Sequence, residues 1–360
     1  ECFTYNDRNL LSTDVDSFSK QFAVRELCRL LRSAVARSVE TSGSRRVAVL
    51  FSGGVDSCLL TKLLVDHGAE VSLFTAAFHE DGLKEPEDLG AAAAAAKMLG
   101  LPVQLVRVNR GDVLEVLQHI SSFIEDMNVP KAGVALTFAV AARAARGLVG
   151  SETPLLSGLG TEECWAGYRR FATAGQLSAT ALGVIGLQDM WHRDLQRDWG
   201  AAAAEGMKII HPFLHEDILR FASAAVPGTM KLSADGSEDK LLLRLAAEAV
   251  GLPPELSRRP KRAAQYGSRI HYSLGRLHPR EYGGQQRTTL IDAVMGMPGA
   301  GHTPAAALLS GTASVAALRT ALMLRVPVKC AVLEGGDPVC AAAARAAADR
   351  LGVPVADAVA

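Results

Sequence analysis

The chain has 360 residues, 49% of them hydrophobic, which suits one large or two medium domains with a sizeable core. Lysine plus arginine and aspartate plus glutamate number 38 each, so no net charge or basic block favours nucleic acid or an anionic membrane as a partner. No C-x-x-C pair indicates a zinc site or a disulfide framework, and no apolar run indicates a membrane span. We expect a cytoplasmic protein. Because the chain opens on Glu1 rather than Met, a mitochondrial location after loss of a targeting peptide stays open.

The first segments of the chain are a polar lead-in and an amphipathic helix. Residues 1–21 are rich in aspartate and serine, and we expect them to be extended. Apolar residues then recur with helical spacing over Phe22–Glu40, which predicts a helix that covers one face of a sheet.

Residues 47–57, Val-Ala-Val-Leu-Phe-Ser-Gly-Gly-Val-Asp-Ser, are the stretch around which the chain is organised. Val47–Phe51 is too short for a buried helix and predicts a central parallel strand. The strand ends at two glycines, and from Val55 a helical period runs to a stop at Gly68. A strand, a glycine turn and a helix N-terminus together predict an anion site.

The residues of this turn suit a nucleotide phosphate. Gly53 and Gly54 allow close approach of the backbone, while Ser52 and Ser57 offer hydroxyls. Asp56 would repel a phosphate unless a divalent cation lay between them, so it predicts Mg²⁺. No lysine follows as a Walker A motif requires. The alternative, a glycine turn that serves topology alone, leaves the serines and the aspartate unexplained.

The next segments alternate between strands and helices. Val71–Phe78 and Pro102–Val108 are expected strands, separated by a helix that begins at Pro86 and stops at Gly100. Helices follow over Asp112–Asp126 and Lys131–Arg146. This alternation predicts an α/β fold with a doubly wound parallel sheet and a ligand at the carboxyl ends of its strands.

Residues 154–171 repeat the pattern of a short apolar strand, a Ser-Gly turn and acids at a helix start. In a doubly wound sheet this turn would open at the same edge as Ser52. Glu162 or Glu163 would then share the metal with Asp56. The alternative is that both acids only favour the helix dipole.

The remaining helical patterns are Leu177–Trp199, Asp217–Ala225 and Lys240–Glu248, with an apolar corner at residues 211–215. Lys240 and Arg244 lie one turn apart in this pattern, on one predicted helix face. A basic loop follows over residues 260–268. Taken singly, these cations are most simply solvated surface charges.

Five ordered motifs resemble the synthetase domain of asparagine synthetases over residues 22–274, and most closely that of asparagine synthetase domain-containing proteins. They are S-G-G-V-D-S, which resembles the PP-loop of ATP pyrophosphatases, L-L-S-G-L-G-T-E-E, H-P-F-L, K-L-L-L-R and R-P-K-R-A-A-Q-Y-G-S. The resemblance implies a PP-loop ATP pyrophosphatase fold of the adenine nucleotide alpha hydrolase-like type, with helical elaborations.

The resemblance also implies chemistry: a carboxylate attacks the α-phosphorus of ATP, pyrophosphate leaves with Mg²⁺, and ammonia or an amine displaces AMP. Phe78 would lie by the adenosine. Lys261 would face the leaving phosphates as a catalytic residue, and Glu162 would replace a metal-binding aspartate, with Asp56 as the other metal ligand. The residues expected to bind the nucleotide and its pyrophosphate are Ser52, Gly53, Gly54, Asp56, Ser57 and Gly158.

Departures from the family pattern put activity in doubt. Leu159 replaces the acid expected to assist amide formation and cannot take a proton. Glu162 is one carbon longer than the family's aspartate, and a misplacement of about 1 Å can cost roughly 10²-fold in rate. The family's R-D-D-R becomes residues 197–200, R-D-W-G, and its E-A-R is replaced near residues 208–210. No glutaminase domain accompanies Cys2, so ammonia is expected from solution or from another chain.

The C-terminal part changes composition. Residues 275–304 are expected to be a linker, and residues 305–360 a small α/β unit that repeats the order of elements over residues 48–103. This unit is either a degenerate partial PP-loop unit without its aspartate or an alanine-rich βαβ unit that is similar by chance. Two functions therefore stay open: an ATP- and Mg²⁺-dependent amide-forming ligase, or an inactive relative that serves as a structural subunit of a multiprotein complex.

Overall fold

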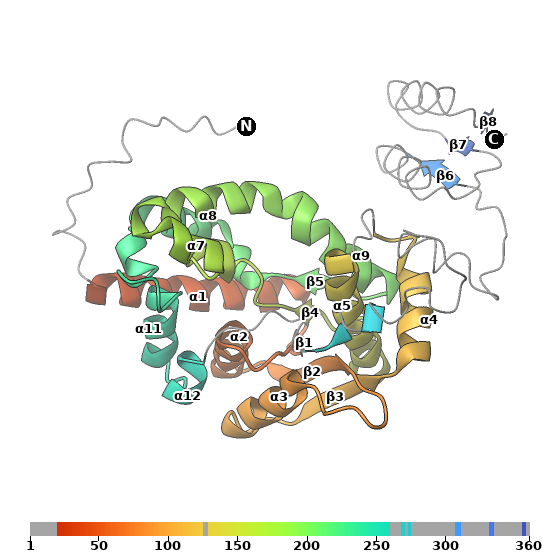
Figure 1. Cartoon of the computed structure of the whole chain (residues 1–360), viewed down its shortest axis with the longest axis horizontal. Coiled ribbons are helices and arrows are strands. Elements are labelled where there is room, and N and C mark those ends of the chain that lie inside the picture. The colour runs from red at the N-terminus through yellow and green to blue at the C-terminus, as the bar shows by residue number, and fades with distance from the viewer. Residues whose placement is uncertain are drawn as a thin grey trace.

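A five-stranded parallel sheet lies at the centre of the chain (Figure 1). The computed structural model describes residues 20–124, 129–259, 268–270 and 273–274, and three further strands at 307–310, 331–334 and 355–357. The central strands are β1 (Arg46–Leu50), β2 (Glu70–Phe78), β3 (Val103–Val108), β4 (Leu155–Leu156) and β5 (Ile209–Ile210). Their order is β3-β2-β1-β4-β5, so the direction of winding reverses between β1 and β4. Ligands bind at such a switch point, beyond the carboxyl ends of the strands.

Twelve α-helices are described around and beside this sheet. They are α1 (Lys20–Ser42), α2 (Val55–Asp66), α3 (Glu87–Met98), α4 (Arg110–Ile120), α5 (Val129–Val149), α6 (Thr161–Cys164), α7 (Arg169–Ala174), α8 (Gln176–Met190), α9 (Gln196–Ala204), α10 (Glu216–Arg220), α11 (Leu241–Ala249) and α12 (Pro254–Ser257). Short π-helical turns follow α8 and α10, at Trp191–Leu195 and Phe221–Ala225, and 3₁₀ turns lie at Pro212–Leu214 and Gly228–Met230.

The sheet is covered on both faces. Val47 and Val49 of β1 belong to a core with α1, α2, α3 and α11, whereas Ala48 between them belongs to a second core with α4, α5 and α9. Successive residues of a strand point to opposite faces, so this alternation is what a doubly wound sheet requires. Figure 1 shows the first group of helices left of and below the sheet, and the second group to its right. The predicted α/β class with a doubly wound parallel sheet is confirmed.

Most expected elements appear within a few residues of their predicted ends, but the interpretation of Lys240 and Arg244 as solvated surface charges was wrong. The helix begins at Leu241, and Lys240 precedes it with a left-handed backbone (φ 54°). Lys240 is 1% exposed and Arg244 is 6% exposed, so neither is a solvated surface charge. The long helix predicted to Trp199 is divided by the π turn at Trp191–Leu195.

In the C-terminal part, three strands form a separate parallel sheet of order β6-β7-β8, with bounds Ala307–Ser310, Ala331–Glu334 and Val355–Asp357. The proposed domain limits remain a prediction, because residues 1–19 and the expected linker 275–304 lie outside the described residues.

Within the described residues, one helical stretch is long and apolar enough to cross a membrane, Pro130–Val149 of α5. Half of it is buried inside the protein, where α5 packs against β2 and α9. A buried core helix passes the same test of length and composition, so this stretch is weak evidence for a membrane span.

Candidate functional site

The loop between β1 and α2 has the form that the sequence predicts. Gly53 adopts a left-handed backbone (φ 69°), and Gly54 precedes α2 without any side-chain cap at this helix N-terminus. The Ser52 hydroxyl accepts a hydrogen bond from the Gly54 N–H at 3.3 Å and lies 3.3 Å from the Ser57 hydroxyl. The first turn of a helix has amide groups without intrahelical partners, so an uncapped N-terminus is ready to bind an anion.

The turn after β4 lies directly beside this loop. A β-carbon placed on Gly158 would lie 3.0 Å from the Asp56 β-carbon, closer than an ordinary van der Waals contact, so the absence of a side chain favours this approach. The next residue, Leu159, donates its backbone N–H to the Ser157 hydroxyl at 3.3 Å. The prediction that the two turns open at one edge of the sheet is confirmed.

Lys240 joins the two turns. Its ammonium lies 2.7 Å and 2.9 Å from the two carboxylate oxygens of Asp56, and 2.7 Å from Oε1 of Glu162. Burial alone would lower the pKa of Lys240, but the two carboxylates outweigh it and hold that pKa above its ordinary value. The structure thus brings Asp56 and Glu162 together, with an ammonium between them that the sequence pattern did not reveal.

Glu163, the other acid of the second turn, faces away from this cluster. It is 1% exposed and forms an ion pair with Arg193. Burial raises the pKa of Glu163, and the Arg193 charge partly opposes this effect. A β-carbon on Gly183 would lie 2.5 Å from the Glu163 carbonyl oxygen, so α8 packs tightly on this residue. Of the two acids proposed to share a metal, only Glu162 lies near Asp56.

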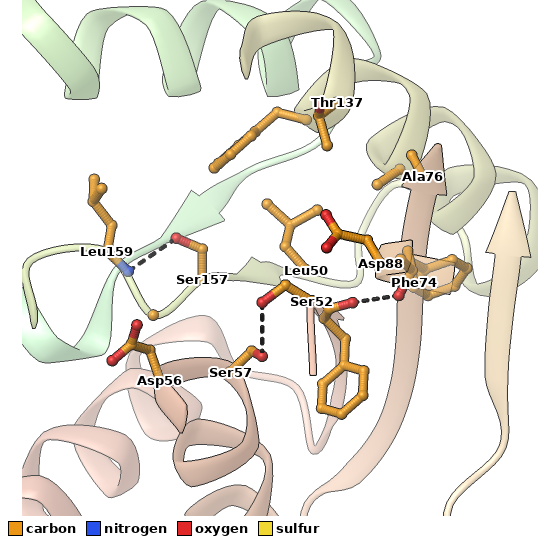
Figure 2. Close-up of a pocket in the computed structure, with 15 residues that line it drawn as sticks. Leu50, Ser52, Asp56, Ser57, Phe74, Ala76, Asp88, Thr137, Ser157 and Leu159 are labelled. Carbon is orange, nitrogen blue, oxygen red and sulfur yellow. Dashed lines mark hydrogen bonds between the residues drawn. The ribbon is translucent and has the colours of Figure 1, made fainter. Parts of the chain in front are cut away.

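A cavity of about 180 Å³ adjoins both turns (Figure 2). Its walls are mainly apolar in area, although seven of its fifteen lining residues have polar side chains. Apolar walls that carry a set of polar groups are typical of small-molecule sites. The lining residues are Leu50, Phe51, Ser52, Asp56, Ser57, Phe74, Thr75, Ala76, Asp88, Thr137, Phe138, Ala141, Ser157, Gly158 and Leu159.

Asp88 is the lining residue whose role the sequence missed. It stands in the first turn of α3, where an acid is expected at any helix start, and nothing in the pattern places it in a cavity. The side chain is buried, and Figure 2 shows its carboxylate directed into the cavity. Burial raises the pKa of Asp88 from 3.8 to about 6, although the charge of Arg259 opposes the rise. A buried carboxylate of this kind is a strong acceptor for a ligand donor.

His211 supports the cavity from behind. Its Nδ1 lies 2.9 Å from the Ser157 hydroxyl. Burial lowers the pKa of His211 to about 4, and the Arg197 charge lowers it further, so the ring is neutral at physiological pH. Arg197 itself is held by Asp194 and Asp198 at 3.1 Å and 2.7 Å. The altered R-D-W-G segment therefore builds a buried ion-pair network behind the cavity.

Two predicted site residues have a different outcome. Phe78 ends β2 but is 1% exposed within the core shared with α4 and α5, and Ala76 lines the cavity instead. Lys261 lies outside the described residues. Two positions earlier, the Arg259 guanidinium donates a hydrogen bond to the Gly53 carbonyl at 2.8 Å, so the residue that precedes the predicted basic loop contacts the loop between β1 and α2.

The predicted metal pair does not fit a resident Mg²⁺ as the residues stand. Asp56 and Glu162 both bind Lys240, and the described part of the chain contains no group of three or more His, Cys, Asp or Glu side chains that could hold a metal ion. Mg²⁺ is usually held by one or two carboxylates together with substrate phosphates. Its donor set here would have to come largely from a nucleotide.

Comparison with known proteins gives a consistent result. The chain is 27% identical over 296 residues to an asparagine synthetase domain-containing protein of Saccharomyces cerevisiae, covering 71% of this chain and 54% of that one. It is 27% identical over 286 residues to a putative glutamine-hydrolyzing asparagine synthetase of Methanocaldococcus jannaschii, covering 69% and 50%. The chain thus spans about half the length of these two relatives. Among solved structures, NMN synthetase from Francisella tularensis is 13% identical, covers 75% of this chain and 99% of its own, and has a TM-score of 0.30.

The family model for asparagine synthase matches residues 26–186 and 174–286, most of the part that contains the sheet and both turns. This match agrees with the resemblance of the five motifs. The chain belongs to the asparagine synthase family.

Proposed function

We propose that the chain binds ATP at the edge of the sheet where β1 and β4 end, and that it adenylates a carboxylate there. The observation that carries this proposal is the meeting of the two turns around one cavity, with Gly158 against Asp56. The phosphates occupy the loop at Ser52–Ser57, because uncapped helix amides and two hydroxyls converge there.

The nucleoside occupies the apolar part of the cavity. Phe74, Ala76 and Phe138 offer apolar surface to a flat base. Asp88 accepts a hydrogen bond from a hydroxyl or amino group of the nucleoside. The neutral His211 fixes the Ser157 hydroxyl at the rim, so that Ser157 is oriented before the ligand arrives.

In the proposed reaction, a carboxylate oxygen attacks the α-phosphorus, the bond from that phosphorus to the bridging oxygen breaks, and pyrophosphate leaves. Ammonia or an amine then attacks the acyl carbon, and AMP leaves with the carboxylate oxygen. The chain's part is to position the phosphates and neutralise their charge. Lys261 supplies charge to the leaving phosphates, which the contact of Arg259 with Gly53 supports. Mg²⁺ is part of the proposal as the counter-ion that ATP brings on its phosphates.

A second candidate, nucleotide binding without turnover, is favoured by Leu159. This residue lines the cavity with an apolar side chain where the family resemblance implies an acid. In this case the chain serves as a nucleotide-responsive subunit of a protein complex.

The test is calorimetric titration with ATP and Mg²⁺, followed by exchange of labelled pyrophosphate into ATP with aspartate present. Binding with exchange supports the adenylating function, and binding without exchange supports the second candidate. Ser52→Ala should weaken binding, because Ser52 is exposed at the loop and has little packing to lose. Ser122→Ala, an exposed serine after α4, is the matched control. Absence of binding by the folded wild-type chain refutes both candidates.

A further inference from the structure

The ammonium of Lys240 is surrounded by hydrogen-bond acceptors from both turns. Besides Asp56 and Glu162, its ammonium lies 3.3 Å from the Thr161 hydroxyl. An ammonium has three N–H donors, and these three residues accept all of them. The side chain is 1% exposed, so water does not compete for these hydrogen bonds.

The surrounding backbone is built to hold this ammonium in place. Lys240 has a φ of 54°, a left-handed conformation that is uncommon for residues other than glycine. Its N–H donates to the Trp165 carbonyl at 3.1 Å. A β-carbon on Gly167 would lie 2.3 Å from Lys240 Cε and 2.0 Å from Glu162 Oε2, so a glycine is needed for the two side chains to pass.

Electrostatics explains why a cation is needed at this point. Two carboxylates that share a site repel each other, and one of them takes up a proton unless a cation lies between them. The sequence suggested a divalent metal for this place. Instead of a metal, the ammonium of Lys240 occupies this place, at hydrogen-bonding distance from both acids. A divalent ion added beside the ammonium would meet a like charge at close range.

We propose that Lys240 is a built-in counter-ion that fills the place between Asp56 and Glu162, so that these carboxylates bind no divalent cation in the absence of nucleotide. Lys240 is thus a positioning residue: it holds the acids of both turns in register and leaves the phosphates as the main ligands for any metal. Removal of the ammonium should convert the pair into a metal site.

The test uses Mn²⁺ as the probe, because it shares the preference of Mg²⁺ for oxygen ligands and its free form is counted by electron paramagnetic resonance. The wild-type chain, without nucleotide, should leave Mn²⁺ free. Lys240→Gln should bind one Mn²⁺ at least about tenfold more tightly, because the substitution removes a positive charge that would repel a divalent ion at close range. The double variant Lys240→Gln with Asp56→Asn should lose the gained binding. Lys62→Gln removes an ammonium that pairs with Asp66 on α2, and it should change nothing.

Circular dichroism of each variant establishes that it folds. Lys240→Asn is the second variant, because asparagine tolerates a left-handed backbone better than most residues. No gain of Mn²⁺ binding in a folded Lys240 variant overturns the proposal. Should neither variant fold, the wild type decides: tight Mn²⁺ binding that Asp56→Asn abolishes overturns the proposal, and free Mn²⁺ supports it. Because no nucleotide is present, the outcome is independent of whether the chain binds ATP.

Discussion

Replacement of Asp88 by asparagine should change how the stability of the protein depends on pH. Burial raises the pKa of this carboxyl from 3.8 to about 6 in the folded chain. A raised folded pKa gives stability that is complete below the unfolded pKa and is lost as the pH rises through the folded pKa. The wild-type protein therefore loses stability through Asp88 between about pH 4 and pH 6, whereas Asp88→Asn does not.

The size of the effect follows from the pKa values. The difference between 3.8 and about 6 corresponds to about 3 kcal/mol in the free energy of unfolding once the pH lies above both values. About 1 kcal/mol of this is expected between about pH 5 and pH 8, a range suited to urea denaturation. The quantity to compare is the stability of Asp88→Asn minus that of the wild type, because other titrating groups are common to both proteins.

The assay is urea denaturation at several pH values, with Asp81→Asn as the control. Asp81 is an exposed aspartate in the loop that leads to α3, so its replacement removes one carboxylate outside the cavity and serves as the matched control. A stability difference for Asp88→Asn that stays constant from about pH 5 to pH 8, or that falls with rising pH, would refute the reasoning. If Asp88 also binds the nucleoside, Asp88→Asn should bind ATP more weakly than the wild type at pH 8.

Three further changes test other parts of the structure. Gly53→Ala should lower the free energy of unfolding, measured by urea denaturation, by about 1–3 kcal/mol, because φ is 69° and the new β-carbon would lie 2.8 Å from a carbonyl oxygen of α3. Gly54→Ala should lower it less, and an equal loss of stability in the two variants would contradict this reasoning. Burial lowers the pKa of Lys231 to about 8, so wild-type stability should rise from about pH 8 to about pH 10.5, and Lys231→Met should abolish that rise; parallel pH profiles would contradict it. Glu163→Gln should lower the melting temperature more than Glu162→Gln, whereas Glu162→Gln should weaken calorimetric ATP binding more; the reverse order would argue against the separate roles of these acids.

The sequence predicted the features of the fold that depend on residues close together in the chain. The apolar run of β1, the glycines of the loop and the helical period of α2 are all contained in one short segment, and the structure has each of them. The second turn was predicted at the same edge because strand order in doubly wound sheets follows general rules. The residue pattern alone left Glu162 and Glu163 open, because the choice depends on α8 packing against Glu163, and only the family resemblance favoured Glu162.

The residues that the pattern missed depend on contacts between distant segments. Taken singly, Lys240 was interpreted as a solvated surface charge, but its contact with Asp56 joins residues 184 positions apart, and its backbone is left-handed at the helix start. In the sequence, Asp88 is an ordinary acid in the first turn of a predicted helix. Only the packing of α3 beside the cavity shows that it is a lining residue. The family resemblance implied that Phe78, at the end of β2, would lie by the adenosine, yet its side chain is buried in the core shared with α4 and α5.

The same distance along the chain has a consequence for folding. The loop between β1 and α2 and the turn after β4 are both made before Lys240 and Arg259, which reach Asp56 and Gly53 across 184 and 206 residues. Closing such long loops is entropically costly, and contacts between distant residues form slowly. A nascent chain that ends before Lys240 therefore has two adjacent carboxylates and no ammonium. The acidic pair therefore gains its counter-ion only after the segment that contains Lys240 has been made.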